Sequence, residues 1–322
     1  MKTTDRLAIL LPAYNEELTI RDTILDFYRK FPKALIVVIN NNSKDKTESI
    51  AAATFKEFKV NGKIINETRQ GKAFAVRTAF HEIEADIYVM SDADCTYQAS
   101  DLNHLIDSLV NESADMIVGD RHHNGAYKNE NKRKFHYLGN MLVKWFINTL
   151  FQSKLNDIMS GYRVFNRKFV KTYPILCKGF ELETEMTLHA LDKGFKVKEE
   201  RIVYKDRPTG SFSKLNTFKD GIKVLKTIIW IFKFYKPFHF FGYLSLSLFF
   251  AGLFSAYPVF KDYYLEKYIY HIPLAILATG LMITSLISLS IGLILDTSSR
   301  FHKFDFELYL LNYKDDKGDG RK

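Results

Sequence analysis

The segment Tyr88–Thr96 reads YVMSDADCT and places two aspartates directly after a short apolar run. An apolar run of this length, bounded by polar residues, is typical of a buried strand. Two carboxylates at positions i and i+2, here Asp92 and Asp94, can share one hard divalent cation, because Mg²⁺ and Mn²⁺ prefer oxygen ligands and often bridge carboxylates to substrate phosphates. The pattern predicts a site for Mg²⁺ or Mn²⁺ and a diphosphate, although such a pair also occurs in solvated turns.

Similar apolar runs recur through the first third of the chain and alternate with segments of helical spacing. We expect strands at 7–11, 34–39, 63–65, 88–90 and 116–119, and helices at 13–31, 47–58, 71–83 and 101–110. Either Asp45 or Ser43 would cap the second of these helices. Short apolar strands that alternate with amphipathic helices predict an α/β fold with a mostly parallel sheet covered on both faces.

Polar side chains follow three of the expected strands where each strand ends. The first strand ends in Pro12–Glu16, the second in Asn40–Ser43 and the fourth in Asp92–Asp94. In open parallel sheets, ligands bind outside the carboxyl ends of the strands. We therefore expect these three segments to converge on one rim of the sheet, where the ligand would bind.

Length and composition limit the class of protein. The 322 residues can build one large core or two moderate units, and 47% hydrophobic content excludes wholesale disorder. A net charge of +9 fits nucleic acid, an anionic membrane face or phosphorylated small molecules as partners. The two cysteines, Cys95 and Cys177, lack metal-ligand spacing and predict a reducing compartment. The apolar run after MKTTDR is too short for a signal peptide.

Several motifs together resemble a known family. They are LPAYNEE at 11–17, INNNSKDKT at 39–47, RQGKAFAVRTAF at 69–80, SDADC at 91–95 and MIVGDR at 116–121. Their order and spacing resemble family-2 glycosyltransferases, which implies the GT-A nucleotide-sugar-binding fold. The likeness continues through DIMSGYR and RPTGSFSKL. Within the family the chain is similar to polyprenyl-phosphate glycosyltransferases, the group that includes dolichyl-phosphate mannose synthases and bacterial undecaprenyl-phosphate glucosyltransferases.

The resemblance implies a set of residues around the nucleotide sugar. These are Pro12, Ala13, Tyr14, Glu16, Asn41, Lys72, Asp92, Ala93 and Asp94, with Asp92 and Asp94 as metal ligands. Asn41 stands where many relatives have an aspartate that binds uracil, and an amide both donates and accepts hydrogen bonds. Thr96 stands where some relatives have a glutamine near the metal. Alternatively, Glu16 marks a helix start and Lys72 a solvated helix position.

A second implied set would hold the acceptor phosphate. It consists of Arg121, Arg133, Arg163, Arg207, Ser213 and Lys214. Guanidinium groups bind phosphate through a planar fork, so arginines suit a lipid monophosphate. For Arg121 and Arg133 the alternative is a charged surface loop, and for the segment around Ser213 it is a simple connection.

The residues expected to act in catalysis are Asp157, Asp94 and Arg121. Asp157 is the first candidate for a base that deprotonates the acceptor, followed by Glu183 and Glu185. A phosphate monoester is already mostly dianionic at neutral pH, because its second pKa is about 6, and needs no base. Asp157 would then orient a neighbour such as Arg163 through an ion pair.

The last third of the chain has the composition of a membrane anchor. Lysines alternate with bulky apolar residues over 216–237, which predicts an amphipathic helix at the membrane interface, or one packed on the enzyme domain. Segments 238–260 and 272–295 contain no acid, lysine or arginine and exceed the roughly 20 residues that a spanning helix needs. Buried core helices are the alternative.

These patterns divide the chain into four expected parts. They are a GT-A domain at 1–215, an interfacial helix at 216–237, a two-helix transmembrane hairpin at 238–299 and a cytoplasmic tail at 300–322. Lysines before the first span, with Arg300 and Lys303 after the second, predict cytoplasmic flanks by the positive-inside rule. The expected location is the inner or plasma membrane, with the catalytic domain on its cytoplasmic side.

The resemblance implies inverting transfer of one sugar from a nucleotide-diphosphate sugar, with UDP favoured, to polyprenyl phosphate such as undecaprenyl phosphate, for cell-envelope glycosylation. The alternative is a glycosyltransferase that extends a lipid-linked saccharide or cell-wall polymer. A processive synthase lacks support because neither tryptophan belongs to a QxxRW motif, and a non-catalytic scaffold is a further alternative. Nucleic acid is not an expected partner. Relatives of this kind form homo-oligomers, including tetramers.

Overall fold

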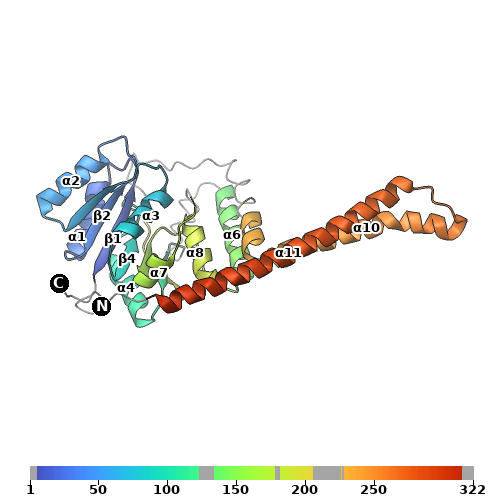
Figure 1. Ribbon diagram of the computed structural model, residues 1–322. Coiled ribbons are helices and arrows are strands. Elements are labelled where there is room, and N and C mark those ends of the chain that lie inside the picture. The colour runs from blue at the N-terminus through green and yellow to red at the C-terminus, as the bar shows by residue number, and fades with distance from the viewer. Residues whose placement is uncertain (1–5, 123–133, 178–181, 206–225, 227, 314–322) are drawn as a thin grey trace. The chain divides into compact units, whose positions relative to one another are not determined.

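The computed structural model describes residues 6–122, 134–177, 182–205, 226 and 228–313. The chain forms two compact units that divide near residue 221. The first unit contains a sheet with helices on both sides, and the second contains two long helices (Figure 1).

Seven strands form one sheet in the first unit. They are β1 Leu7–Ala13, β2 Leu35–Asn40, β3 Gly62–Asn66, β4 Ile87–Met90, β5 Met116–Asp120, β6 Arg163–Asn166 and β7 Val197–Arg201. The strand order is β3-β2-β1-β4-β6-β5-β7, and β6 runs antiparallel to β4 and β5, whereas the other pairs are parallel. The five strands expected from apolar runs are therefore present, and the sheet is mostly parallel as predicted.

Helices cover both faces of the sheet, so most residues of the inner strands are buried and apolar. The helices of this unit are α1 Ile20–Lys30, α2 Thr47–Phe58, α3 Lys72–Glu82, α4 Leu102–Asn111, α6 Lys134–Phe151, α7 Arg167–Thr172 and α8 Leu182–Asp192. Apolar residues of α1, α2 and α4 share one core with strand residues such as Ile9 and Val89. On the other face, Phe80 of α3 packs edge-on against Tyr88 and Phe165. Burial on both faces is what βαβ connections produce.

Local signals set the beginning of α2. The backbone N–H of Thr47 donates to Asp45 Oδ1 at 3.0 Å, and the Thr47 hydroxyl donates to the same oxygen at 2.5 Å. Lys46 occupies the cap position and its side chain makes no cap hydrogen bond, whereas Asp45, one residue earlier, is the one of the two candidates that accepts from the first residue of the helix.

The second unit is a helical hairpin. α10 spans Pro237–Glu266 and α11 spans Ile272–Asn312, and both are long and apolar enough to cross a membrane. Both expected spans lie within these helices. α11 continues without a break through 296–312, so most of the segment expected as a tail is helical. Residues 216–225 and 227 of the expected interfacial helix lie outside the described residues, and 228–235 is helical.

Small residues at intervals of seven line the contact between α10 and α11. Ser245 and Gly252 of α10 face Ser285 and Ala278 of α11, and the Ser245 and Ser285 hydroxyls each donate to the other residue's carbonyl at 2.9 Å. Gly292 lies so close to Phe241 that an added Cβ would be 2.9 Å from the Phe241 Cβ. Small side chains allow helix backbones in a membrane to approach closely, and serines add hydrogen bonds between helices.

Candidate active site

The loops after β1, β2 and β4 meet at the carboxyl end of the sheet. The Thr19 hydroxyl donates to the carbonyl of Ala93 at 2.8 Å, which joins the segment after β1 to the aspartate motif after β4. The backbone N–H of Asn15 donates to Ser43 Oγ at 3.1 Å, which joins the loops after β1 and β2. The three polar segments therefore share one rim, as the sequence predicted.

A buried lysine lies between two carboxylates at this rim. Lys72 Nζ, at the start of α3, is 2.5 Å from Asp92 Oδ1 and 2.6 Å from Glu183 Oε1 of α8. Burial alone would lower the pKa of Lys72, but the Asp92 and Glu183 carboxylates outweigh it and raise this pKa above its ordinary value. Lys72 thus keeps a positive charge in contact with Asp92, the first aspartate of the motif. Glu183, an alternative candidate for the base, contacts Lys72 and not Asp157.

Gly161 packs directly against this charged cluster. A Cβ at position 161 would lie 2.8 Å from Asp92 Oδ2 and 3.1 Å from Lys72 Nζ. The backbone N–H of Gly161 donates to the hydroxyl oxygen of Tyr97 at 3.1 Å. The absence of a side chain at this position therefore allows the segment before β6 to approach Asp92.

The second aspartate of the motif is held in a turn. Asp94 is 2% exposed, and its Oδ1 accepts hydrogen bonds from the Thr96 backbone N–H at 3.2 Å and the Thr96 hydroxyl at 2.5 Å. Cys95, between them, has a left-handed backbone with φ of 61°. Thr96, which replaces the glutamine of some relatives, thus fixes the orientation of Asp94.

Arg121 and Asp157 form a two-pronged ion pair. Arg121 Nε is 2.7 Å from Asp157 Oδ2, and Arg121 Nη2 is 2.9 Å from Asp157 Oδ1. Burial would raise the pKa of Asp157, but the Arg121 guanidinium outweighs it and holds that pKa below its usual range. The guanidinium also lies 5.5 Å from the centre of the Tyr204 ring. Because its pKa is lowered, the Asp157 carboxylate is a poor proton acceptor. Its two hydrogen bonds instead suit it to orient the Arg121 guanidinium.

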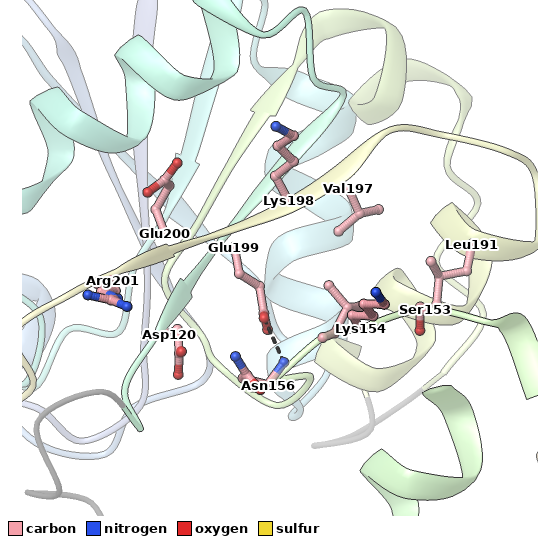
Figure 2. Close-up of a pocket in the computed structure, with 11 residues that line it drawn as sticks. Asp120, Ser153, Lys154, Asn156, Leu191, Val197, Lys198, Glu199, Glu200 and Arg201 are labelled. Atoms are coloured by element: carbon pink, nitrogen blue, oxygen red, sulfur yellow. Dashed lines mark hydrogen bonds between the residues drawn. The ribbon is translucent and has the colours of Figure 1, made fainter. Parts of the chain in front are cut away.

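Glu199 of β7 holds the loop that carries Asp157. Its carboxylate accepts from the backbone N–H groups of Asn156 and Asp157 at 2.6 and 2.7 Å, and the first contact is dashed in Figure 2. Burial raises the pKa of Glu199 to about 7. A cavity of about 450 Å³ adjoins Glu199 and is lined by Asp120, Lys198 and Arg201 among others, but by none of the residues predicted for the site.

Arg163 is fully buried under the same loop. It donates to the carbonyls of Ser160 and Ile158 at 2.9 and 2.6 Å and to the Thr187 hydroxyl at 2.9 Å. These contacts do not fit the predicted role of Arg163 as a phosphate ligand or as the ion-pair partner of Asp157, because its guanidinium is directed into the protein. Arg163 instead supports the 158–160 segment.

The expected base-binding side of the site is also tightly bonded. The Asn41 amide donates to the carbonyl of Arg69 at 2.7 Å and accepts from the backbone N–H of Gly71 at 2.7 Å, which ties the loop after β2 to the start of α3. Glu67, whose pKa the Arg69 guanidinium lowers to about 2, orders the same loop. Pro12 and Ala13 are the last two residues of β1, and Tyr14 and Glu16 follow it.

Four residues of the predicted acceptor set lie outside the described residues. They are Arg133, Arg207, Ser213 and Lys214. Arg121 is the member of that set whose surroundings the structure describes and whose position suits the role. Glu185 accepts from the backbone N–H of Cys177 at 2.9 Å and has a local structural role.

Comparisons with known proteins identify the family. The family model described as glycosyl transferase family 2 matches residues 8–173. This chain belongs to that family. Glycosyltransferase AglJ of Haloferax volcanii is 31% identical over 79% of this chain and 80% of its own length. The dolichyl-phosphate hexose transferase of the same organism is 27% identical over 70% of this chain and 94% of its own length. The predicted resemblance is therefore confirmed.

A solved structure supports the same conclusion for the fold. Glucosyl-3-phosphoglycerate synthase from Mycobacterium tuberculosis, in complex with Mn²⁺, UDP-glucose and phosphoglyceric acid, matches with a TM-score of 0.56 at 17% identity, over 72% of this chain and 80% of that chain. The catalytic unit of this family-2 glycosyltransferase thus has the GT-A fold that the motifs implied.

The donor chemistry at the rim of this glycosyltransferase fits a hard divalent cation. Asp92 and Asp94 supply carboxylate oxygens, which Mg²⁺ and Mn²⁺ prefer, and substrate phosphates commonly complete such a shell. Among the described residues, no group of three or more His, Cys, Asp or Glu side chains could hold a metal ion. The arrangement suits a cation shared with a bound diphosphate better than a site built from protein ligands alone.

Three residues of the site were not predicted from the sequence of this glycosyltransferase. Tyr97, Gly161 and Glu199 all contact the predicted residues or their loops. Gly161 lies within the recognised motif DIMSGYR, and Tyr97 follows SDADC by two residues, so their positions were the available signal. No sequence signal pointed to Glu199, because a carboxylate in a strand is ordinarily exposed to solvent at the edge of a sheet.

Proposed function

We propose that this glycosyltransferase transfers a single hexose, with inversion, from a nucleotide-diphosphate sugar, UDP being the expected nucleotide, to the phosphate of a polyprenyl lipid such as undecaprenyl phosphate. The observation that carries the proposal is the proximity of two charged clusters to Tyr97. Asp92 and Lys72 form one, and both lie against Gly161, whose backbone N–H donates to the Tyr97 hydroxyl. Arg121 and Asp157 form the other, and the Arg121 guanidinium lies over the ring of Tyr204, which meets the ring of Tyr97. A reaction between a departing diphosphate and an attacking phosphate needs positive charge at both ends.

Arg121 supports an anionic acceptor. Asp157 fixes its guanidinium through two hydrogen bonds, so little side-chain entropy remains to be lost when Arg121 binds a phosphate. The acceptor phosphate is mostly dianionic at neutral pH, so its oxygen can attack the anomeric carbon without a strong base. Asp157 therefore acts by orienting Arg121, and positioning provides much of the rate increase.

Lys72 and the aspartate motif support a diphosphate donor. Lys72 places a permanent positive charge beside Asp92, next to the position that the diphosphate would occupy. Asp92 and Asp94 would hold Mg²⁺ or Mn²⁺, which would neutralise charge on the departing diphosphate. Asn41 and the loop ordered by Glu67 and Arg69 would form the wall beside the base and ribose.

The second unit and the named relatives support a lipid acceptor. α10 and α11 are each longer than the roughly 20 residues needed to span a bilayer. A relative that is similar over 70% of this chain is described as a dolichyl-phosphate hexose transferase. The positive residues on either side of the two helices favour a catalytic unit on the cytoplasmic side, where nucleotide sugars are made.

The test is transfer to a defined lipid. The full-length protein in detergent is incubated with radiolabelled nucleotide hexoses, Mg²⁺ or Mn²⁺ and undecaprenyl phosphate, and radioactivity in the organic phase is measured. We expect label from at least one donor, only when the lipid carries a phosphate. Label that enters only a lipid-linked saccharide or polymer would favour the extending transferase, and no label from any donor would contradict the proposal.

A matched pair of variants tests the assignment of Arg121. Arg121→Lys keeps the charge and loses the fork, so we expect the KM for undecaprenyl phosphate to rise about tenfold, with little change for the nucleotide sugar. Arg21 forms a similar two-pronged pair with Glu57 on the exposed surface, at 2.9 Å for both contacts. Arg21→Lys should leave both constants unchanged.

A further inference from the structure

Tyr97 is a buried phenol between the two charged clusters. The residue is 3% exposed. Its hydroxyl accepts from the backbone N–H of Gly161, which lies against Asp92 and Lys72. Its ring meets that of Tyr204, over which the Arg121 guanidinium lies. Burial raises the pKa of Tyr97 well above its ordinary value, so the hydroxyl keeps its proton at neutral pH and can donate it in a hydrogen bond.

Aromatic contacts fix the ring of Tyr97. It stacks on Tyr162 with ring centres 5.1 Å apart, and its edge meets Tyr204 at 5.7 Å. Tyr97 and Tyr204 also pair through an isolated antiparallel bridge. A ring held on two sides cannot turn its hydroxyl away without disturbing both neighbours, so its direction is set before substrate binds.

Among the described residues, the Tyr97 hydroxyl has a partner for its oxygen but no acceptor for its proton. The oxygen accepts from the backbone N–H of Gly161 at 3.1 Å. A phenol both donates and accepts, yet within the described part of the chain no acceptor for the Tyr97 proton is found. Buried hydroxyls ordinarily donate, because an unmet donor costs free energy. Gly161 also lies against Asp92 and Lys72, so the open donor is next to the expected diphosphate.

We propose that Tyr97 is a further catalytic residue, whose hydroxyl donates a hydrogen bond to a phosphoryl oxygen of the bound substrate. This inference rests on the proposed function. The oxygen belongs either to the departing diphosphate or to the acceptor phosphate, since the hydroxyl lies between the groups assigned to each. No bond to Tyr97 forms or breaks, and the donor acts by stabilising charge on the phosphoryl group.

The variant that tests this is Tyr97→Phe, with Tyr162→Phe as the matched control. Tyr162 stacks on the same ring, but its hydroxyl donates to the carbonyl of Gln98 at 3.0 Å. A hydrogen bond to a charged group corresponds to roughly a 10- to 100-fold effect, so kcat/KM of Tyr97→Phe should fall by that factor. Tyr162→Phe should keep kcat/KM within about threefold of the wild type.

Binding measurements separate the two sources of the oxygen. Calorimetric titration with UDP and with uridine is carried out on the full-length protein and both variants. If Tyr97 contacts the diphosphate, Tyr97→Phe weakens UDP binding about tenfold or more and leaves uridine binding unchanged. If it contacts the acceptor, UDP binding is retained and the KM for undecaprenyl phosphate rises. Either result supports the inference.

Two outcomes would overturn it. In one, Tyr97→Phe matches the wild type in kcat, both KM values and UDP affinity. In the other, Tyr97→Phe lowers uridine affinity and thermal stability as much as it lowers UDP affinity. The hydroxyl would then serve only to hold the backbone of Gly161. If the wild type binds UDP but transfers no sugar to undecaprenyl phosphate, the proposed function fails, whereas the UDP and uridine titrations still test Tyr97.

Discussion

At the scale of single residues, Gly161 shows how closely the charged cluster is packed. An added methyl group would approach Asp92 Oδ2 to 2.8 Å and Lys72 Nζ to 3.1 Å, so one of these groups would have to move. A displacement of about 1 Å near reacting groups commonly reduces rates about 100-fold, whereas overpacking costs about 1–3 kcal/mol of stability. We therefore expect Gly161→Ala to lose activity by roughly that factor while the protein stays folded.

The measurement is transfer rate together with thermal unfolding of the purified protein. Gly242→Ala is the control, because an added Cβ at position 242 would have no heavy atom within 4 Å. A Gly161→Ala protein with wild-type rates would show that Asp92 and Lys72 can shift without loss, and the functional importance of their contact would have to be abandoned.

The buried side chain of His189 should make the stability of the protein depend on pH. It lies against the rings of Phe169, Tyr173 and Phe195, and burial lowers its pKa to about 4. Between pH 6.5 and 4 the unfolded chain therefore binds more protons than the folded one at this position. The stability that the neutral imidazole provides is present above pH 6.5 and is lost as the pH falls, by at most about 3 kcal/mol.

We expect His189→Phe to become progressively more stable than the wild type on acidification from pH 6.5 to 4. Glu199 titrates in the opposite sense, because its raised pKa favours the folded state as the pH falls toward 4.5, but this contribution is common to both proteins and cancels. Chemical denaturation at a series of pH values gives the difference. His81→Phe, at an exposed position of α3, should show no such trend, and a constant difference for His189→Phe would contradict the prediction.

At the scale of elements, the sequence predicted the parts that follow from local pattern. β1, β2 and β4 are apolar runs that end in polar residues, so both their existence and the position of the site followed from them. β6 was not predicted. It has only four residues and begins with a charged residue, Arg163, and it overlaps the motif DIMSGYR, which was interpreted as part of the site and not as a strand. The ion pair of Lys72 with Glu183 joins residues 111 positions apart, and no local pattern encodes such a contact. Packing, rather than periodicity, determines it.

The contact between α10 and α11 depends on small residues at particular positions. Gly292 meets Phe241, whereas an added Cβ at Gly280 of the same helix would have no heavy atom within 4 Å. We expect Gly292→Val to separate the helices locally and to lower the unfolding free energy by about 1–3 kcal/mol, and Gly280→Val to have a much smaller effect. Thermal unfolding in detergent compares the two. Equal effects would indicate that valine in the helix, and not the contact, is responsible.

At the scale of the whole molecule, the distribution of charge around the two apolar helices predicts the membrane topology. Lys233 and Lys236 precede α10, and Arg300 and Lys303 follow the apolar part of α11. The connection at 261–271, between the apolar stretches, is balanced by comparison, because it carries two lysines and two acids. His271 Nδ1 in this segment lies 2.6 Å from Asp262 Oδ2. By the positive-inside rule, we expect both flanks on the cytoplasmic side and the connection on the opposite side.

Single cysteines test this topology in a protein that carries Cys95→Ala and Cys177→Ala. Tyr268 lies in the connection and is 60% exposed, and His302 is an exposed residue of α11 beyond its apolar part. In intact cells with a permeabilised outer envelope, we expect a membrane-impermeant maleimide to label Tyr268→Cys and not His302→Cys, and to label both once the membrane is opened. The reverse pattern would place the catalytic unit on the side that lacks nucleotide sugars. Labelling of both in intact cells would mean that the hairpin does not span the membrane, and this would contradict the predicted transmembrane anchor.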